Sequence, residues 1–352
     1  MSVLSVRDLN VTYRTKGGDV PAVRGVSFDI EKGRVLGLAG ESGCGKSTIA
    51  GAILRLHSAQ TKIEGQILLD GQDVLALSPG KLRAARWTGA SIVFQGALHA
   101  LNPVQKIGQQ IAEAIQVHGM AGEREAFVRA GNLVEQVGLP GRRIDDYPHE
   151  LSGGQKQRVM IAMALACDPL LLIADEPTTA LDVMVQAQVL RLLADIKRER
   201  GLSMLFITHD LSVLASVADR LAVMYAGRFV EEGPATQMLG RPAHPYTAAL
   251  AAAFPTIGDP RSRRHPEGLP GDPPDPSALP SGCTFHPRCP YAVDECLNVA
   301  IELRAVSAGW RAACVHVQPA SVSSRVPADA AGNDTGGNDT GGNDAGGNDT
   351  GG

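Results

Sequence analysis

Apolar and polar residues alternate differently in successive parts of this chain, and the first part reads as strands. Residues from about 3 to 40 contain short apolar stretches separated by polar residues. The last of them, VLGLAG at residues 35–40, is an apolar run that leads into a glycine-rich turn, as is typical of a buried strand. Farther on, GQILLDGQDV at residues 65–74 predicts a hairpin, because Asp70-Gly71 is a favoured two-residue turn.

From about residue 79 to 149 the pattern changes to a helical period. Ile107, Ile111 and Ile115 recur at the spacing of one helix face, which predicts a helix over residues 107–117. A second amphipathic helix is expected over residues 123–139, with Phe127, Val134 and Val137 on its apolar face. We interpret this stretch as a helical insert within an α/β body.

Helices and apolar strands alternate after Leu151. The helix expected at residues 155–166 leads to the strand LLLIAD, and the helix at 184–200 leads to the strand MLFITHD. Such alternation predicts a mainly parallel sheet, and a final hairpin is expected at residues 221–233.

The C-terminal part has a different composition. Proline and glycine increase beyond about Arg241, which indicates a linker, and a cysteine-bearing segment with little core of its own follows. From about Ser321 the chain becomes a repeat of glycine, asparagine, aspartate and threonine. This tail has nothing apolar to bury, so we expect it to be disordered.

Composition and charge exclude several classes of protein. The net charge of −4 gives no basic surplus for nucleic acid, and 4% aromatic residues argue against base stacking. The N-terminus lacks the pattern of a signal peptide, and no apolar run approaches the length of a membrane span. We therefore expect a cytosolic protein, in which clustered cysteines favour metal or redox chemistry over structural disulfides.

The segment GESGCGKST at residues 40–48 fits the phosphate-loop pattern G-x-x-x-x-G-K-[ST]. It follows an expected strand and precedes an expected helix, so its backbone N–H groups can converge on phosphate oxygens at a helix N-terminus. Lys46 is expected to reach the β- and γ-phosphates and Ser47 to bind Mg²⁺, while Cys44 is expected to be a neutral but reachable residue. The expected ATP-binding residues are Gly40, Ser42, Gly43, Gly45, Lys46, Ser47 and Thr48.

Two carboxylates end the strand LLLIAD. Asp175, at the edge of the strand, suits Mg²⁺ held through water, and Glu176 can polarise the water that attacks the γ-phosphate.

A second anion site is predicted at LSGGQ, residues 151–155. Ser152 is a natural N-cap, and Gly153 and Gly154 expose backbone N–H groups beside Gln155 at the start of a helix. Two phosphate-binding helix termini in one chain suggest ATP held between two subunits. At this point the chain resembles the nucleotide-binding subunits of ATP-binding cassette (ABC) transporters, whose signature is LSGGQ.

The resemblance covers residues from about 3 to 255 and implies further roles. Gln95 matches the glutamine that senses Mg²⁺ and water and contacts the membrane subunits, and Asp182 matches the aspartate of the D-loop. His209 matches the switch histidine at the γ-phosphate, and Tyr13 the aromatic residue that stacks on adenine. The implied α/β fold has a RecA-like core, an antiparallel β subdomain and a helical subdomain at about residues 96–160. Two such subunits would close head to tail on two ATP molecules, hydrolyse them and reopen.

The end of the chain is similar to the ATPases of oligopeptide, dipeptide and nickel importers. HPYTAAL at residues 244–250 and GCTFHPRCPYAVDEC at residues 282–296 carry this likeness. It implies two transmembrane permease subunits, a second identical or related ATPase, an extracytoplasmic binding protein and a place on the cytoplasmic face of the membrane. Peptides are the implied cargo, with nickel or another small solute open. Gly96 and Ala97 stand where an acid and a proline are commoner, which puts the coupling surface in doubt.

Cys283, Cys289, Cys296 and Cys314 are separated by five, six and seventeen residues. Four thiolates suit tetrahedral Zn²⁺ or an iron–sulfur cluster, and the absence of a closely spaced pair favours a [4Fe–4S] cluster. The resemblance associates this segment with such a cluster, while zinc, free thiols and a disulfide stay open. The expected layout is an ATP-binding domain at residues 1–255, a cysteine-rich extension at 256–320 and a tail at 321–352.

Two other functions fit parts of the sequence. A soluble ABC ATPase of DNA repair or ribosomes is one, although such chains usually fuse two cassettes or carry a long coiled coil. A redox sensor or electron carrier is the other, and the complete set of ATPase motifs argues against it as the principal role.

Overall fold

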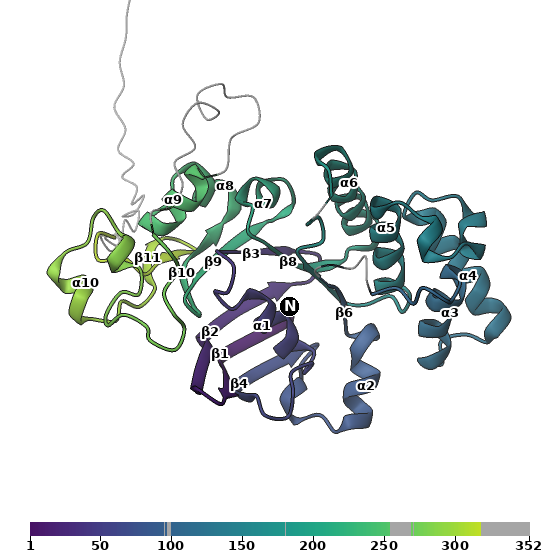
Figure 1. The fold of residues 1–352 in the computed structure, drawn as a ribbon, viewed down its shortest axis with the longest axis horizontal. Helices are drawn as coiled ribbons and strands as arrows, with labels where there is room; N and C mark the ends of the chain where they lie inside the picture. The colour runs from purple at the N-terminus through teal and green to yellow at the C-terminus, as the bar shows by residue number, and fades with distance from the viewer. Residues whose placement is uncertain (95, 97–99, 180, 254–268, 270, 318–352) are drawn as a thin grey trace, which may run out of the picture. The chain divides into compact units, whose positions relative to one another are not determined.

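Two β-sheets form the body of the protein (Figure 1). The computed structural model describes residues 1–94, 96, 100–179, 181–253, 269 and 271–317. Within these residues the smaller sheet is antiparallel, with the strand order β2-β1-β4-β5. Its strands are β1 (Ser2–Thr15), β2 (Gly18–Glu31), β4 (Lys62–Leu69) and β5 (Gln72–Asp73). Leu69 pairs with Gln72, which confirms the hairpin predicted at Asp70-Gly71.

The first two strands are longer than the sequence indicates. Short strands were expected up to residue 40, but β1 and β2 each span 14 residues. Polar residues break the apolar alternation near Asp8, whereas the pairing continues through a register shift between Val6 and Leu9. Asp8 has a positive φ of 44° there, and its N–H donates to Ser27 Oγ at 2.9 Å. Such a bulge interrupts the side-chain pattern without ending the strand.

The larger sheet has the order β11-β12-β10-β9-β3-β8-β7-β6 among the described residues. Its strands are β3 (Val35–Ala39), β6 (Ala90–Val93), β7 (Leu171–Asp175), β8 (Ser203–Thr208), β9 (Arg220–Tyr225), β10 (Arg228–Pro234), β11 (Arg304–Ser307) and β12 (Trp310–Ala312). The strands from β9 to β6 are parallel, as predicted, and β9 and β10 form the expected hairpin. Every residue of β3, β7 and β8 is buried, because both faces of the sheet are covered.

The core has one layer on each face of this sheet. Val35 and Ala39 of β3 face one layer, whereas Leu36 and Leu38 face the other. Helix α1 (Lys46–Ile53) and the smaller sheet lie on the second side, and α7 (Leu211–Val217), α8 (Ala235–Gly240) and α9 (Pro245–Ala252) lie on the first (Figure 1). The carboxyl ends of the parallel strands are thereby left for the loops that carry the site motifs.

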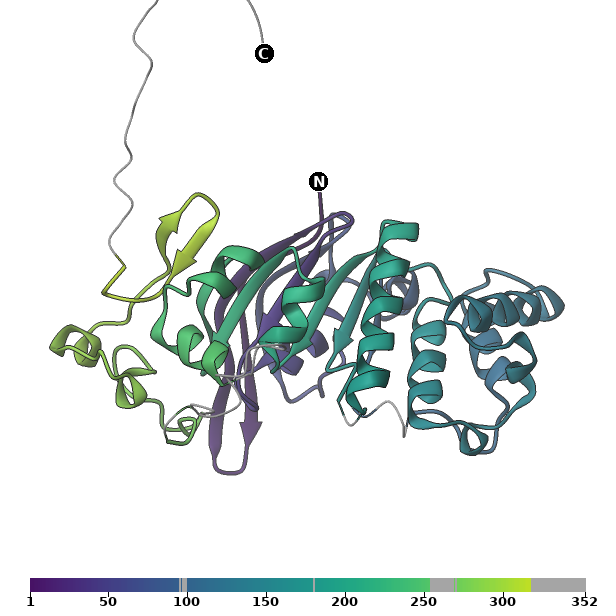
Figure 2. The ribbon, with the colours of Figure 1, turned by 90° about the horizontal axis from the view of Figure 1, so that it is seen from above.

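The helical part lies beyond β6. Its elements are α3 (Ile107–Val117), α4 (Glu123–Gln136) and α5 (Gly153–Ala164), followed by α6 (Val183–Arg200), whereas α2 (Pro79–Thr88) precedes β6 and contacts it. Helix α3 covers the predicted residues, and its three isoleucines are fully buried. Figure 2 shows α3 and α4 packed together on the far side of α5 from α6. No helix within the described residues is long and apolar enough to cross a membrane.

The C-terminal segment is built into the larger sheet. Strand β12 pairs with β10, at Glu231 and Ala312, and Phe285 and Trp310 belong to the main core. The segment has little core of its own, as expected, because its large apolar side chains pack on the core of the ATP-binding part. The linker, however, does not begin at Arg241, since α9 follows and its Tyr246 is fully buried. Residues 254–268 and the repeat tail lie outside the described residues.

Candidate functional site

The phosphate loop connects β3 to α1, as the motif predicts. Gly40 and Gly45 have positive φ angles of 152° and 110°. A Cβ atom at Gly40 would lie 2.3 Å from Met224 O, and one at Gly45 would lie 2.3 Å from Ala22 O. Backbone conformation and close approach therefore both require glycine at these two positions.

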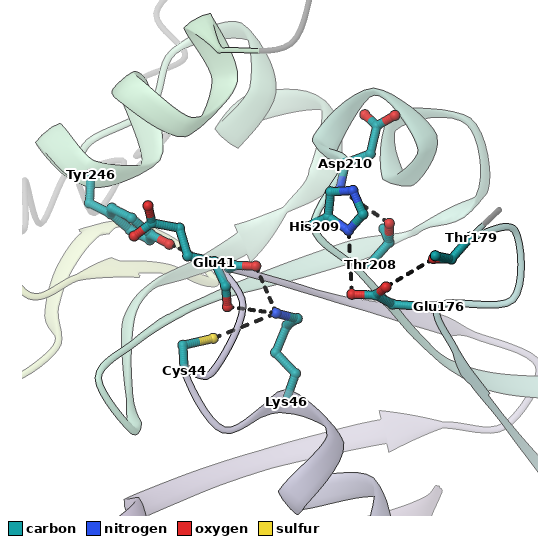
Figure 3. Close-up of polar contacts among 10 residues, drawn as sticks. Glu41, Cys44, Lys46, Glu176, Thr179, Thr208, His209, Asp210 and Tyr246 are labelled. Atoms are coloured by element: carbon teal, nitrogen blue, oxygen red, sulfur yellow. Dashed lines mark hydrogen bonds and ion pairs between the residues drawn. The ribbon is translucent and has the colours of Figure 1, made fainter. Parts of the chain in front are cut away.

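Lys46 is buried and bends back over the loop (Figure 3). Its Nζ donates to Gly40 O at 2.7 Å and to Glu41 O at 2.8 Å. Cys44 Sγ lies 3.8 Å from the same nitrogen, and the cysteine is only 6% exposed, so the expectation that it is reachable is wrong. The loop thus encloses the ammonium group of Lys46, the cation that binds phosphate in this motif.

Asp175 lies at the buried end of β7 beside the phosphate loop. Burial raises the pKa of its carboxyl above the ordinary value, while a hydrogen bond with Ser47 and the charge of Lys46 act against this rise. Its Oδ1 is buried and has no hydrogen-bond partner. A buried carboxylate oxygen of this kind, next to a serine hydroxyl, suits a hard divalent cation such as Mg²⁺.

Glu176 follows at a strained position. Its φ is 47°, a left-handed value that is uncommon for a residue with a side chain, and its N–H donates to Ile207 O at 2.9 Å. Thr179 Oγ1 donates to Glu176 Oε2 at 2.9 Å, and His209 Nδ1 lies 3.3 Å from Oε1. Figure 3 shows this pair of side chains across from Lys46. The strands β7 and β8 therefore bring Glu176 and His209 to one edge of the sheet.

Tyr13 lies on β1 next to the first turn of α1. Its hydroxyl is 3.1 Å from Thr48 Oγ1 and 3.4 Å from His57 Nδ1, and its ring meets the His57 ring edge-on. The structure thus places Tyr13 at the helix that begins with the phosphate loop.

The signature segment starts α5 as predicted. Gln155 N donates to Ser152 Oγ at 3.4 Å, and Ser152 N donates to Gln155 Oε1 at 3.0 Å, which together form a capping box. Asp182 likewise caps α6 by accepting from Val185 N at 2.9 Å. Helix α5 packs on α3, α4 and α6, whereas α1 contacts β2 and β7. Within the described contacts, no hydrogen bond joins the signature to the phosphate loop, and Gln95 lies outside the described residues.

Comparisons with known proteins agree with this geometry. The family model described as "ABC transporter" matches residues 23–179, and the one described as "Oligopeptide/dipeptide transporter, C-terminal region" matches residues 230–296. A probable peptide ABC transporter ATP-binding protein of Sinorhizobium fredii is 45% identical over 316 residues, which are 89% of this chain and 94% of that protein. The chain belongs to the ATP-binding proteins of ABC transporters.

Two further comparisons support the same family. The oligopeptide transport ATP-binding protein OppD of Salmonella typhimurium is 43% identical over 89% of this chain and 93% of its own length. Among solved structures, a dimeric bacterial ABC transporter cassette has a TM-score of 0.60 at 28% identity, over 66% of this chain and 98% of the cassette. A dimeric post-hydrolysis state with ADP and phosphate, at a TM-score of 0.59, is similar too. The fold is that of an ABC ATPase, and ATP hydrolysis is its reaction.

The four C-terminal cysteines of this ABC ATPase lie near one another and are all free. Burial raises the pKa of Cys283, and Cys296, Cys289 and Cys314 raise it further by their charges. However, no three histidine, cysteine or acidic side chains of the described residues are grouped closely enough to hold a metal ion. The donor set is present, but its arrangement does not form a single-ion site.

Three residues around the phosphate loop were missed by sequence reasoning. Glu41 occupies a variable position of the motif, yet its N–H donates to the Tyr246 hydroxyl at 2.8 Å, and its carboxylate pairs with Arg288. Tyr246 and Arg288 lie within the stretches that carried the likeness to peptide importers. No local pattern could have linked them to residue 41, more than 200 positions away.

Proposed function

We propose that this chain is the ATP-hydrolysing subunit of a peptide importer. It would lie on the cytoplasmic face of the membrane, against two permease subunits that receive peptides from an extracytoplasmic binding protein. The names of the relatives from Sinorhizobium and Salmonella, and the match at residues 230–296, support peptides as cargo. Nickel or another small solute is the alternative cargo, and a soluble ABC ATPase outside transport is the alternative role.

The observation that carries the ATPase mechanism is the convergence of Lys46, Asp175 and Glu176 at one sheet edge. In this proposal the glycines and hydroxyls of residues 40–48 surround the phosphates, and Tyr13 stacks on adenine. Ser47, Asp175 and Gln95 would hold Mg²⁺, which supplies charge neutralisation for the phosphate oxygens. The buried Oδ1 of Asp175, which has no hydrogen-bond partner, supports this role.

Glu176 is proposed as the base that orients and polarises the attacking water. Thr179 and His209 hold both of its carboxylate oxygens, at 2.9 and 3.3 Å, so the carboxylate has a defined direction. His209 is half exposed beside it and would contact the γ-phosphate of bound ATP.

A second subunit completes the proposed site. Ser152, Gly153, Gly154 and Gln155 expose the N-terminus of α5, and Asp182 caps α6, on a part of the fold separate from the phosphate loop. A head-to-tail dimer would place this anion site on the γ-phosphate held by the other chain. We propose that residues 1–255 form the ATP-binding domain that dimerises, with the helical subdomain at residues 96–160. Residues 256–320 would form its cysteine-rich extension, and residues 321–352 a tail.

Replacing Glu176 by glutamine tests the proposed mechanism. Glutamine keeps the size and can still accept from Thr179, but it cannot act as a base, so ATP binding should persist while turnover falls by about 10²–10⁴-fold. The measurement is steady-state phosphate release beside an ATP titration, and the dimer should accumulate with ATP bound. Wild-type hydrolysis by Glu176→Gln would show that another group activates the water.

We also propose that Cys283, Cys289, Cys296 and Cys314 bind a [4Fe–4S] cluster. Support comes from four free thiols of suitable number in one segment and from their wide spacing. The cluster would serve as a structural crosslink of this segment. Chemical analysis of anaerobically purified protein should find iron and acid-labile sulfide in equal amounts, whereas stoichiometric zinc without iron would contradict the cluster.

A further inference from the structure

An ion pair joins the C-terminal segment to the phosphate loop. Arg288 Nη1 donates to Glu41 Oε2 at 2.7 Å, and Nη2 donates to Oε1 at 3.0 Å. The arginine side chain is 6% exposed and the glutamate side chain 21%. Paired bonds of this geometry between a guanidinium and a carboxylate are both strong and directional. A residue of the cysteine-bearing segment is therefore attached to the second residue of the phosphate motif.

An aromatic cluster fixes the position of this arginine. Arg288 lies over the ring of Tyr225 at 5.9 Å, and its Nη1 is 3.3 Å from the Tyr225 hydroxyl. Tyr225 packs against Tyr246 and Phe285, with ring centroids 4.6 and 5.3 Å away. Because Phe285 and Arg288 come from the same short segment, the packing that anchors the segment also directs the guanidinium at the loop.

Glu41 transmits this attachment to the nucleotide-binding groups. Its carbonyl oxygen accepts from Lys46 Nζ at 2.8 Å, and its N–H donates to Tyr246 at 2.8 Å. The main chain of Glu41 therefore helps to hold the lysine that the motif assigns to the phosphates. Its side chain, in contrast, places a negative charge beside an anion site, and Arg288 neutralises that charge.

We propose that Arg288 is a positioning residue for ATP binding: through Glu41 it holds the start of the phosphate loop in place and cancels a carboxylate charge that would repel the phosphates. This inference rests on the proposed ATP site and extends it to a residue of the C-terminal segment. Arg288 need not touch the nucleotide. The C-terminal segment thus contributes to the affinity of the ATPase for ATP.

The test is calorimetric titration of the full chain with Mg-ATP, using Arg288→Gln and a matched control. Arg311→Gln is the control, because Arg311 joins the same C-terminal segment to the body through Glu232, at 2.6 and 2.9 Å, away from the loop. With an effective dielectric constant of about 20, one uncompensated charge about 10 Å from the phosphates weakens affinity roughly tenfold. We expect that loss in Arg288→Gln and unchanged affinity in Arg311→Gln.

A second substitution separates charge from folding. In the double variant Glu41→Gln/Arg288→Gln the repelling charge is absent, so affinity should recover most of the loss. Thermal unfolding is recorded for each variant as well. If Arg288 had only a structural role, the loss of ATP affinity in Arg288→Gln and in Arg311→Gln would parallel the loss of Tm in each. Should Arg288→Gln fail to fold, Arg288→Lys keeps the charge but not the paired bonds, and a loss of about two- to fourfold is expected.

The outcomes separate the two proposals. Wild-type affinity in Arg288→Gln, or in a folded Arg288→Lys where only that variant can be measured, overturns the positioning role. Equal losses of affinity and Tm in Arg288→Gln and Arg311→Gln overturn it as well. Failure of the wild-type chain to bind Mg-ATP would instead contradict the proposed ATP site itself.

Discussion

Glu231 of β10 is expected to be one of the most sensitive positions for stability. Its side chain is fully buried, and it accepts three hydrogen bonds, from Ala243 N (2.9 Å), His244 N (2.9 Å) and Trp310 Nε1 (2.8 Å). Glu231→Ala leaves all three donors without their acceptor. Each unsatisfied buried donor costs about 1–3 kcal/mol, and since such losses are not additive we expect a total of about 3–5 kcal/mol.

Urea unfolding of the full chain at neutral pH, followed by tryptophan fluorescence, measures this loss. The adjacent Glu232 provides the control, because its partners Arg311 and Arg220 are both about half exposed and can be hydrated when the carboxylate is removed. Glu232→Ala should therefore cost only about 1 kcal/mol. A loss below about 1 kcal/mol in Glu231→Ala, or equal losses in both variants, would show that the three buried donors do not depend on this carboxylate.

Three further predictions concern pH, the phosphate loop and the signature helix. Burial lowers the pKa of His244 to about 4, whereas the value in the unfolded chain is about 6.5. As the pH falls, the unfolded state therefore binds a proton before the folded state does. The free energy of unfolding should decrease by about 3 kcal/mol between pH 6.5 and pH 4. Unfolding curves of His244→Asn should show a shallower fall, and parallel profiles would contradict this assignment. Lys46→Ala should abolish tight binding of ATP, and retained affinity in a titration would exclude the phosphate-loop role. Gly154→Ala places a Cβ 2.4 Å from Val185 Cγ1, so it should destabilise the chain by about 1–3 kcal/mol. A second substitution, Val185→Ala, should restore most of that stability. If it restores none, the clash with Val185 is not the cause of the destabilisation.

Much of the fold follows from local patterns. Helix α3 begins and ends where its isoleucine spacing predicts, and Ser152 caps α5 through a box formed by residues three positions apart. The phosphate loop likewise needs glycines at fixed offsets after an apolar strand. Such features depend on backbone dihedral angles, capping and side-chain period, which neighbouring residues determine.

The β bulge at Asp8 and the course of the C-terminal segment could not be predicted in this way. The polar residues in β1 form a pattern that predicts the end of a strand, although pairing with β2 continues beyond them. The proline and glycine residues after Arg241 predict a linker, although Tyr246 is buried in the core a few residues later. In both cases long-range packing overrode the local signal.

The motifs alone establish that the chain carries an ATPase site, because each motif is short and its chemistry is contained in its own residues. The contacts of Arg288 with Glu41 and of Glu231 with Trp310, in contrast, arise from long-range packing. These pairs are 247 and 79 positions apart. Their contact depends on β12 joining β10 and on the aromatic packing around Phe285, and neither follows from the residues next to them in the chain.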